Sequence, residues 1–153
     1  MGLTRREMLV AGGVGCAALA NAFFSPGSAA EKDEKDETAE FVARQMGRAA
    51  TESERLHLIM PAVFPTGYTV PMDLKVDSPM TEDDHVKRIS VFAPQNPLID
   101  VASFNFVPRR SVPRVSTRIR LAKPQFVVAV AEMGDGTLLM AKTYVDVATN
   151  GCI

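Results

Sequence analysis

The stretch RVSTRIRL, residues 114–121, alternates in character at every step and decides the fold class of this chain. Its two sets of alternating side chains are Val115, Thr117, Ile119 and Leu121 on one side, and Arg114, Ser116, Arg118 and Arg120 on the other. Successive side chains of a β-strand point to opposite faces, so a period of two predicts a strand with one face on a core. We expect the arginine-bearing face to be solvated, with contact to acidic groups as the alternative.

Six further stretches share this strand character and are separated by turn signals. They cover residues 55–60, 69–76, 85–92, 101–107, 126–132 and 137–148. Breakers such as PTGY, APQNP and VPRRSVP lie between them, and MGDG predicts a tight hairpin because Asp-Gly readily adopts positive φ. Seven short strands in about ninety residues predict an all-β fold, an immunoglobulin-like β-sandwich, with a small barrel as the alternative.

One predicted strand, FVVAVAE at 126–132, is apolar on both faces. Its second face must therefore be covered, either by a partner subunit or by a helix of the same chain. The stretch AEFVARQMGRAA, residues 39–50, predicts one short N-terminal helix with Phe41, Val42 and Met46 on a loosely apolar side.

The overall composition is that of an ordinary globular domain. The 153 residues carry a formal net charge of −1, 46% of them are hydrophobic and none is Trp. This balance excludes a disordered or a membrane-embedded chain. Near-neutral charge gives no support for nucleic-acid binding, so we expect no nucleic-acid partner.

The first thirty residues predict an export signal. Arg5 and Arg6 precede a weakly apolar run, and the small residues of SPGSAA follow it. A basic start, an apolar middle and a small-residue end make a secretory signal, and the paired arginines are typical of the twin-arginine type, which exports folded proteins. Cleavage near Ala30 leaves a periplasmic protein outside the membrane. The alternative is an uncleaved anchor, although the run of about 17 residues is short for a bilayer span of ~20.

Only one of the two cysteines is expected to remain after export. Cys16 lies within the signal and is interpreted as a small apolar residue that is discarded, with lipidation as a minor alternative. Cys152 then has no internal disulfide partner, which suggests either a bond to a partner or a working thiol. Beyond the last strand, a flexible arm would give this thiol a reach of about 15 Å.

The expected order is a twin-arginine signal peptide (1–30), a charged mobile segment (31–39), the sandwich domain (40–148) and the arm (149–153).

No constellation of residues predicts an enzyme. His57 and His85 are far apart in the sequence, and no Cys/His spacing matches a zinc or haem site. The acidic stretch TEDDH, residues 81–85, is interpreted as a solvated turn, with metal binding as the alternative. We therefore expect no catalytic residue, no metal and no cofactor.

Three longer stretches resemble the SoxY family. They are SPMTEDDHVKRISVFAPQNP, VSTRIRLA and VVAVAEMGDG, and a cysteine-bearing tail and a twin-arginine signal accompany them. SoxY proteins are sulfur-substrate carrier subunits of the periplasmic thiosulfate-oxidising (Sox) multienzyme system. The resemblance covers the whole chain and is strongest from about Val70 to Val147. It implies an immunoglobulin-like sandwich and a heterodimer with a SoxZ-like subunit, which would cover the two-sided strand.

The resemblance also implies a function and a set of partners. A c-type cytochrome complex would attach thiosulfate oxidatively to the arm cysteine as cysteine S-thiosulfonate. A hydrolase would release the terminal sulfone as sulfate, and a sulfane dehydrogenase or another sulfane acceptor would process the remainder. The carrier itself catalyses nothing. Carried over to this chain, the carrier residue is Cys152, and Asn150 and Gly151 belong to its arm.

The arm departs from the family pattern, which typically ends Gly-Gly-Cys-Gly-Gly. This chain ends Asn150-Gly151-Cys152-Ile153. The Asn and the β-branched Ile restrict the backbone, and a terminal carboxylate near the sulfur disfavours the thiolate. The residues therefore support a sulfur carrier more strongly than a thiosulfate carrier. The alternative function is a structural β-sandwich subunit whose terminal cysteine forms only an intersubunit disulfide.

Overall fold

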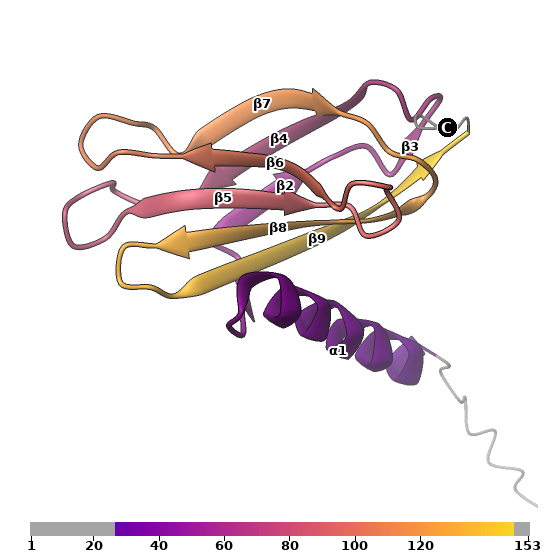
Figure 1. Cartoon of the computed structure of the whole chain (residues 1–153), viewed down its shortest axis with the longest axis horizontal. Helices are drawn as coiled ribbons and strands as arrows, with labels where there is room; N and C mark the ends of the chain where they lie inside the picture. The colour runs from indigo at the N-terminus through magenta and orange to yellow at the C-terminus, as the bar shows by residue number, and fades with distance from the viewer. Residues whose placement is uncertain (1–26, 149–153) are drawn as a thin grey trace, which may run out of the picture.

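The two layers of an immunoglobulin-like β-sandwich, with one helix beside them, make up the computed structural model (Figure 1). It describes residues 27–148, with side chains from Glu37 onward. The strands are β1 (Thr51–Glu52), β2 (Leu56–Ile59), β3 (Val63–Phe64), β4 (Val70–Val76), β5 (Val86–Phe92), β6 (Asp100–Asn105), β7 (Arg114–Ile119), β8 (Gln125–Met133) and β9 (Leu138–Val147). All seven predicted strands are confirmed. The two-residue strands β1 and β3 were not predicted.

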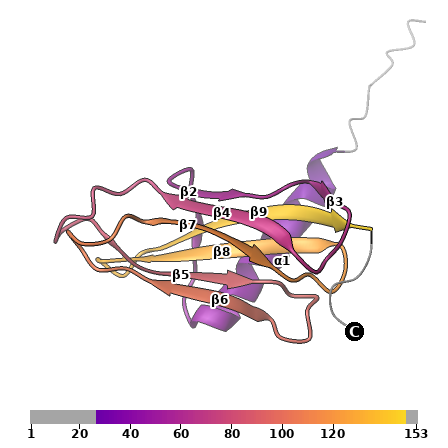
Figure 2. The same ribbon diagram turned by 90° about the horizontal axis from the view of Figure 1, so that it is seen from above.

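The larger sheet has the order β1-β9-β8-β5-β6, and β3 also pairs with β9. The smaller sheet has the order β2-β4-β7 and lies over the larger one, as the view from above shows (Figure 2). Both β1 and β3 run parallel to β9, whereas β8 runs antiparallel to it. The last strand therefore has more strand partners than any other described strand.

The main core lies between the two sheets and follows the period of two. In β4, Val70, Met72 and Leu74 are buried while Asp73 and Lys75 are exposed. In β7 the predicted alternation holds only in part, because β7 is the outer strand of its sheet. There Ile119 is buried, Val115 is half-buried and Thr117, which we expected to face the core, is exposed.

The predicted hairpin joins β8 to β9. Gly136 has a φ of 89°, and its N–H donates to the carbonyl of Met133 at 3.1 Å. The carboxylate of Asp135 accepts from the N–H of Thr137 at 2.8 Å, and this backbone hydrogen bond lowers the pKa of Asp135. Glycine supplies the positive φ without a steric cost, as the Asp-Gly signal predicted.

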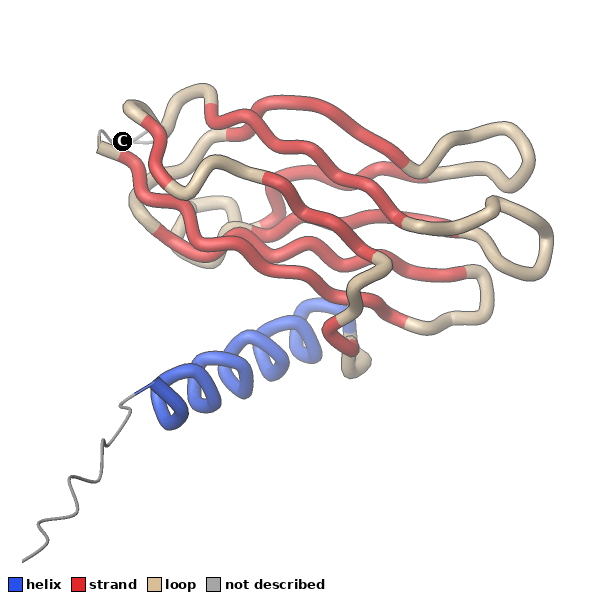
Figure 3. The backbone as a smooth tube through the Cα atoms, turned by 180° about the vertical axis from the view of Figure 1, so that it is seen from behind, coloured by secondary structure: helices blue, strands red, loops and turns tan. Residues whose placement is uncertain are grey.

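The second apolar face of β8 is covered by the helix α1 (Gly27–Met46), which lies across the outer face of the larger sheet (Figure 3). Val42 is fully buried there. The residues packed around it are Phe92, Val128, Val130, Leu138 and Met140. The Phe41 ring meets the Phe92 ring edge-on, with centroids 5.9 Å apart. Of the two coverings expected for this face, a helix of the same chain is the one found, so the SoxZ-like subunit implied by the resemblance is not what covers it.

The helix differs from its prediction at both ends. It ends at Met46 rather than residue 50 because Gly47 adopts a φ of 69°, the left-handed conformation that terminates helices. It begins at Gly27, so the charged segment 31–39, expected to be mobile, is helical. Ala, Glu and Lys are good helix formers, which explains the longer helix. Among the residues described, no helix is long and apolar enough to cross a membrane.

Candidate functional site

The predicted site residues lie outside the described part of the chain. These are the arm residues Asn150, Gly151, Cys152 and Ile153, and the signal residues Arg5 and Arg6. The structure does describe the place from which the arm continues. We call this place the arm root and define it as residues 145–148 together with β3.

The arm root is held from both sides. On one side, the N–H of Asp146 donates to the carbonyl of Ala62 at 2.8 Å, and the N–H of Ala148 donates to the carbonyl of Phe64 at 3.2 Å. On the other side, Val145 is paired with the first residue of β8. The side chains of Val145 and Val147 are buried in the main core. The backbone is therefore fixed as far as its last described residue.

Sequence reasoning missed β3, which supplies half of this anchor. Val63 and Phe64 lie between Pro61 and Pro65, and a strand of two residues is too short to show a period. The available signal was Phe64 itself, a large apolar side chain in a Pro-bounded loop, which packs against the main core.

Exposed apolar side chains gather at the end of the sandwich that carries the arm root. They come from the ends of β2 and β9, from β3, and from the loops before β4 and β6, and they are Ile59, Val63, Tyr68, Leu98 and Tyr144. The exposed fraction reaches 80% for Leu98 and 68% for Val63. Grouped exposed apolar side chains are typical of surfaces that meet other proteins.

A buried amide connects two loops at this same end. Gln125, the first residue of β8, is 3% exposed. Its Oε1 accepts from the N–H of Gln95 at 2.8 Å, and its Nε2 donates to Oδ1 of Asn96 at 2.9 Å. That same Oδ1 accepts from the N–H of Ala122 at 2.8 Å, and Nδ2 of Asn96 donates to the carbonyl of Arg120 at 2.8 Å. The loops before β6 and before β8 are thereby fixed relative to one another.

Aromatic side chains line a hollow of about 580 Å³ between α1 and the outer face of the larger sheet. The Phe126 and Tyr144 rings are 5.0 Å apart and edge-on, and the Lys142 ammonium lies 5.0 Å from the centre of the Phe126 ring. Arg44 of α1 completes the rim. Glu37 and Glu40 of α1 also line the hollow, and Tyr144, its lining residue from β9, directly precedes the arm root.

The two histidines serve separate local contacts. Nε2 of His57 lies 2.8 Å from Oδ2 of Asp77, and Nζ of Lys75 lies 2.6 Å from the other carboxylate oxygen. The hydrogen bond with His57, followed by that with Lys75, lowers the pKa of Asp77 to about 2. The ring of His85 packs against Gly134, and its buried Nδ1 has no hydrogen-bond partner among the residues that the structure describes.

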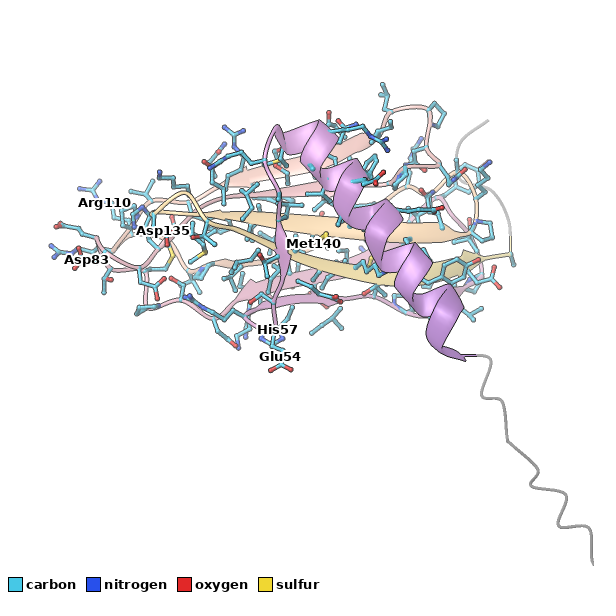
Figure 4. All side chains as sticks on the ribbon, turned by 90° about the horizontal axis from the view of Figure 1, so that it is seen from below. Glu54, His57, Asp83, Arg110, Asp135 and Met140 are labelled. Atoms are coloured by element: carbon cyan, nitrogen blue, oxygen red, sulfur yellow. The ribbon has the colours of Figure 1, made fainter. Side chains whose placement is uncertain are left out.

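The acidic stretch 81–85 forms a structured turn. Asp84 pairs with the Arg55 guanidinium at 2.8 Å, and its N–H donates to Oγ1 of Thr81 at 3.0 Å. Asp83 of this turn lies at the same end of the sandwich as Arg110 and Asp135, and His57 lies apart from them beside Glu54 (Figure 4). Within the described residues, no group of three or more His, Cys, Asp or Glu side chains is placed to hold a metal ion.

Comparisons with known proteins give a family and a fold. The model of the family described as "Sulfur oxidation protein SoxY" matches residues 42–152. The sulfur carrier protein SoxY from Chlorobium limicola f thiosulfatophilum is similar in structure, with a TM-score of 0.59 and 30% sequence identity. That similarity covers 74% of this chain and 98% of the other. No curated protein matches the sequence.

Superoxide reductases have a similar fold. The enzyme (neelaredoxin) from Ignicoccus hospitalis has a TM-score of 0.55 and 16% identity, over 72% of this chain and 91% of that one. A putative superoxide reductase from Thermotoga maritima has a TM-score of 0.52 and 18% identity, over 60% and 84% of the two chains. At such identities the likeness concerns the fold alone. The family model and the Chlorobium protein agree, and this chain belongs to the SoxY family of sulfur oxidation proteins.

Proposed function

We propose that this chain is a covalent carrier of sulfur intermediates, which it holds on Cys152 during the oxidation of sulfur compounds. The family match extends to residue 152 and so includes this cysteine, and the similar Chlorobium protein is a sulfur carrier. The observation that carries the proposal is the anchored arm root. The fold secures Ala148 four residues before the cysteine, and a carrier needs such a fixed starting point for a short arm.

The chemistry at the thiol has three steps. Loading joins the sulfur of Cys152 to the sulfane sulfur of thiosulfate, and two electrons and one proton leave, with a c-type cytochrome complex as the electron acceptor. A hydrolase then uses water to break the bond between the sulfane and the sulfone sulfur, which releases sulfate and a proton and leaves a cysteine persulfide. A sulfane dehydrogenase then withdraws electrons from the outer persulfide sulfur while it is still bound, or another sulfane acceptor takes that sulfur and returns the Cys152 thiol. The chain itself catalyses none of these steps.

The carrier works in the periplasm, to which the twin-arginine pair Arg5 and Arg6 directs it, and it forms a heterodimer with a SoxZ-like subunit. Family membership supports this setting. Because α1 covers the outer face of β8, such a subunit binds to another surface. The exposed apolar side chains around the arm root suit contact with the enzymes that load and unload the arm.

Mass spectrometry of the C-terminal tryptic peptide tests the proposal. The last Lys or Arg is Lys142, so this peptide spans residues 143–153 and contains one cysteine. Protein purified from sulfur-grown cells should carry thiosulfonate or persulfide adducts on it, and Cys152→Ser should abolish sulfur oxidation. The matched control Cys16→Ser should leave oxidation intact.

An unmodified peptide during turnover, or normal sulfur oxidation by Cys152→Ser, would refute the carrier function. Non-reducing electrophoresis separates it from the structural alternative. A structural intersubunit disulfide is quantitative and stays oxidised throughout turnover, whereas a carrier thiol cycles.

A further inference from the structure

Positive charge is concentrated in one part of this nearly neutral chain. Residues 101–131 contain five Arg and one Lys and no Asp or Glu, although the formal net charge of the chain is −1. The basic residues are Arg109, Arg110, Arg114, Arg118, Arg120 and Lys123. This segment runs from β6 through β7 into β8, and the charges lie on β7 and in the loops before and after it.

Most of these charges have no partner within the described structure. Arg109 pairs with Glu82 at 3.3 Å. The side chains of Arg114, Arg118 and Arg120 make no hydrogen bond or ion pair with the described residues. These exposed guanidinium groups are therefore available to the carboxylates of a binding partner.

The charges border two free strand edges. Among the described strands, β6 pairs only with β5 and β7 only with β4, so each is the outer strand of its sheet, and the two lie on the same side of the sandwich (Figure 1). An outer strand presents a row of unpaired backbone N–H and C=O groups. Each edge therefore has the hydrogen-bonding groups to accept a further strand.

A groove of about 480 Å³ runs between these edges. Val101, Ala102, Phe104 and Ile119 supply its apolar lining. Its charged lining residues are Arg118, Arg120 and one carboxylate, Asp100. The 80%-exposed Leu98 extends the apolar surface towards the arm root. Two arginines against one carboxylate leave the groove net cationic beside its apolar lining, which matches a ligand that alternates apolar and acidic groups.

We propose that this groove binds an extended, acidic segment of a partner protein, which adds to β7 as a further strand. Side chains of a strand alternate between two faces, so every second residue of the segment faces the arginines of β7 while the others face the groove. Opposite charges on neighbouring strands attract, which selects an acidic segment. The proposal goes beyond the carrier function and does not depend on the chemistry of Cys152.

Protection against aggregation is the competing explanation, because charged side chains on an outer strand prevent edge-to-edge pairing. Charge of either sign on the strand achieves that protection. It requires neither an apolar groove beside the strand nor a 31-residue segment without carboxylates. Both features are expected for a surface that binds an acidic strand.

A labelled, end-capped peptide that alternates Glu and Val is the probe, and fluorescence anisotropy with the full chain is the assay. The expected result is saturable binding, together with slower amide hydrogen exchange at residues 115–119. The double variant Arg118→Glu/Arg120→Glu should weaken binding about tenfold, because attraction becomes repulsion across the strand pair. The charge-matched control Lys87→Glu/Arg110→Glu, whose positions do not line the groove, should bind like the wild type.

Three outcomes would overturn the proposal. The first is no binding of the Glu-Val peptide. The second is equal binding of a peptide with the same composition in scrambled order, or of inorganic polyphosphate, since either shows a plain anion-attracting surface. The third is an equal loss in the control variant. Circular dichroism of each variant establishes that it is folded before its affinity is compared.

Discussion

Replacing Val42 by Ala tests whether α1 is an integral part of the fold. The side chain is fully buried against the outer face of the larger sheet. Its two lost carbons cost ~0.8 kcal/mol each in transfer free energy, about 1.6 kcal/mol together. The cavity left behind adds about 0.5–1 kcal/mol, and the better helix propensity of Ala returns about 0.5 kcal/mol. The net loss of unfolding free energy should therefore be about 2 kcal/mol.

Urea denaturation followed by far-UV circular dichroism measures this loss. With a denaturant slope of about 1–3 kcal/mol per molar urea for a small domain, the midpoint should fall by about 1 M. Gln45→Ala is the matched control, since Gln45 lies on the exposed side of the same helix and should change stability by only a few tenths of a kcal/mol. If Val42→Ala shifts the midpoint no more than Gln45→Ala does, the helix does not pack on the sheet in solution and the account of the covered face is wrong.

Three further substitutions test other contacts. Gln125→Ala should lower the unfolding free energy by about 2 kcal/mol in a urea titration, because the groups that bond to its buried amide lose their partner. Removal of the exposed side chain of Gln95 by Gln95→Ala should change it little. Equal losses would contradict the conclusion that Gln125 holds the loops before β6 and β8 together. Asp77→Asn should be less stable than the wild type at neutral pH, and the difference in unfolding free energy should shrink as pH falls from about 4 to 2. The reason is that the contacts of Asp77 with His57 and Lys75 stabilise the fold only while its carboxylate is ionised. A difference that does not change with pH would refute this. Gly134→Ala should destabilise by about 1–3 kcal/mol, since its Cβ would lie 2.5 Å from Cε1 of His85, and His85→Ala in the same chain should restore most of the loss in a double-mutant cycle.

The sequence predicted the long strands well because their alternation reflects burial directly. In β4, the buried Val70, Met72 and Leu74 are the residues that the period of two places on the core. The strands β1 and β3 have two residues each, so they carry no period and were missed. The end of α1 depends on one left-handed glycine, Gly47, within a stretch that otherwise favours a helix.

The candidate site could be predicted only in part. Cys152 stands out in the sequence because removal of the expected signal peptide leaves it as the single thiol. The surroundings of the arm root carried no such signal. Leu98 and Tyr68 are isolated apolar residues in loops, and only the pairing of strands brings their loops to the same end. The basic segment 101–131 is visible in the sequence, but its free edges become apparent only from the sheet order.

The pairing of β9 has a consequence for the order of synthesis. Its partners β1, β3 and β8 all precede it in the chain, and its own Val145 and Val147 fill the main core. A nascent chain that stops before β9 leaves both small strands unpaired and the core open, so it should stay unfolded and be accessible to proteases. The chain can therefore reach the native state only after β9 has been synthesised. A molecule that has folded has been translated at least as far as the residues that precede its cysteine.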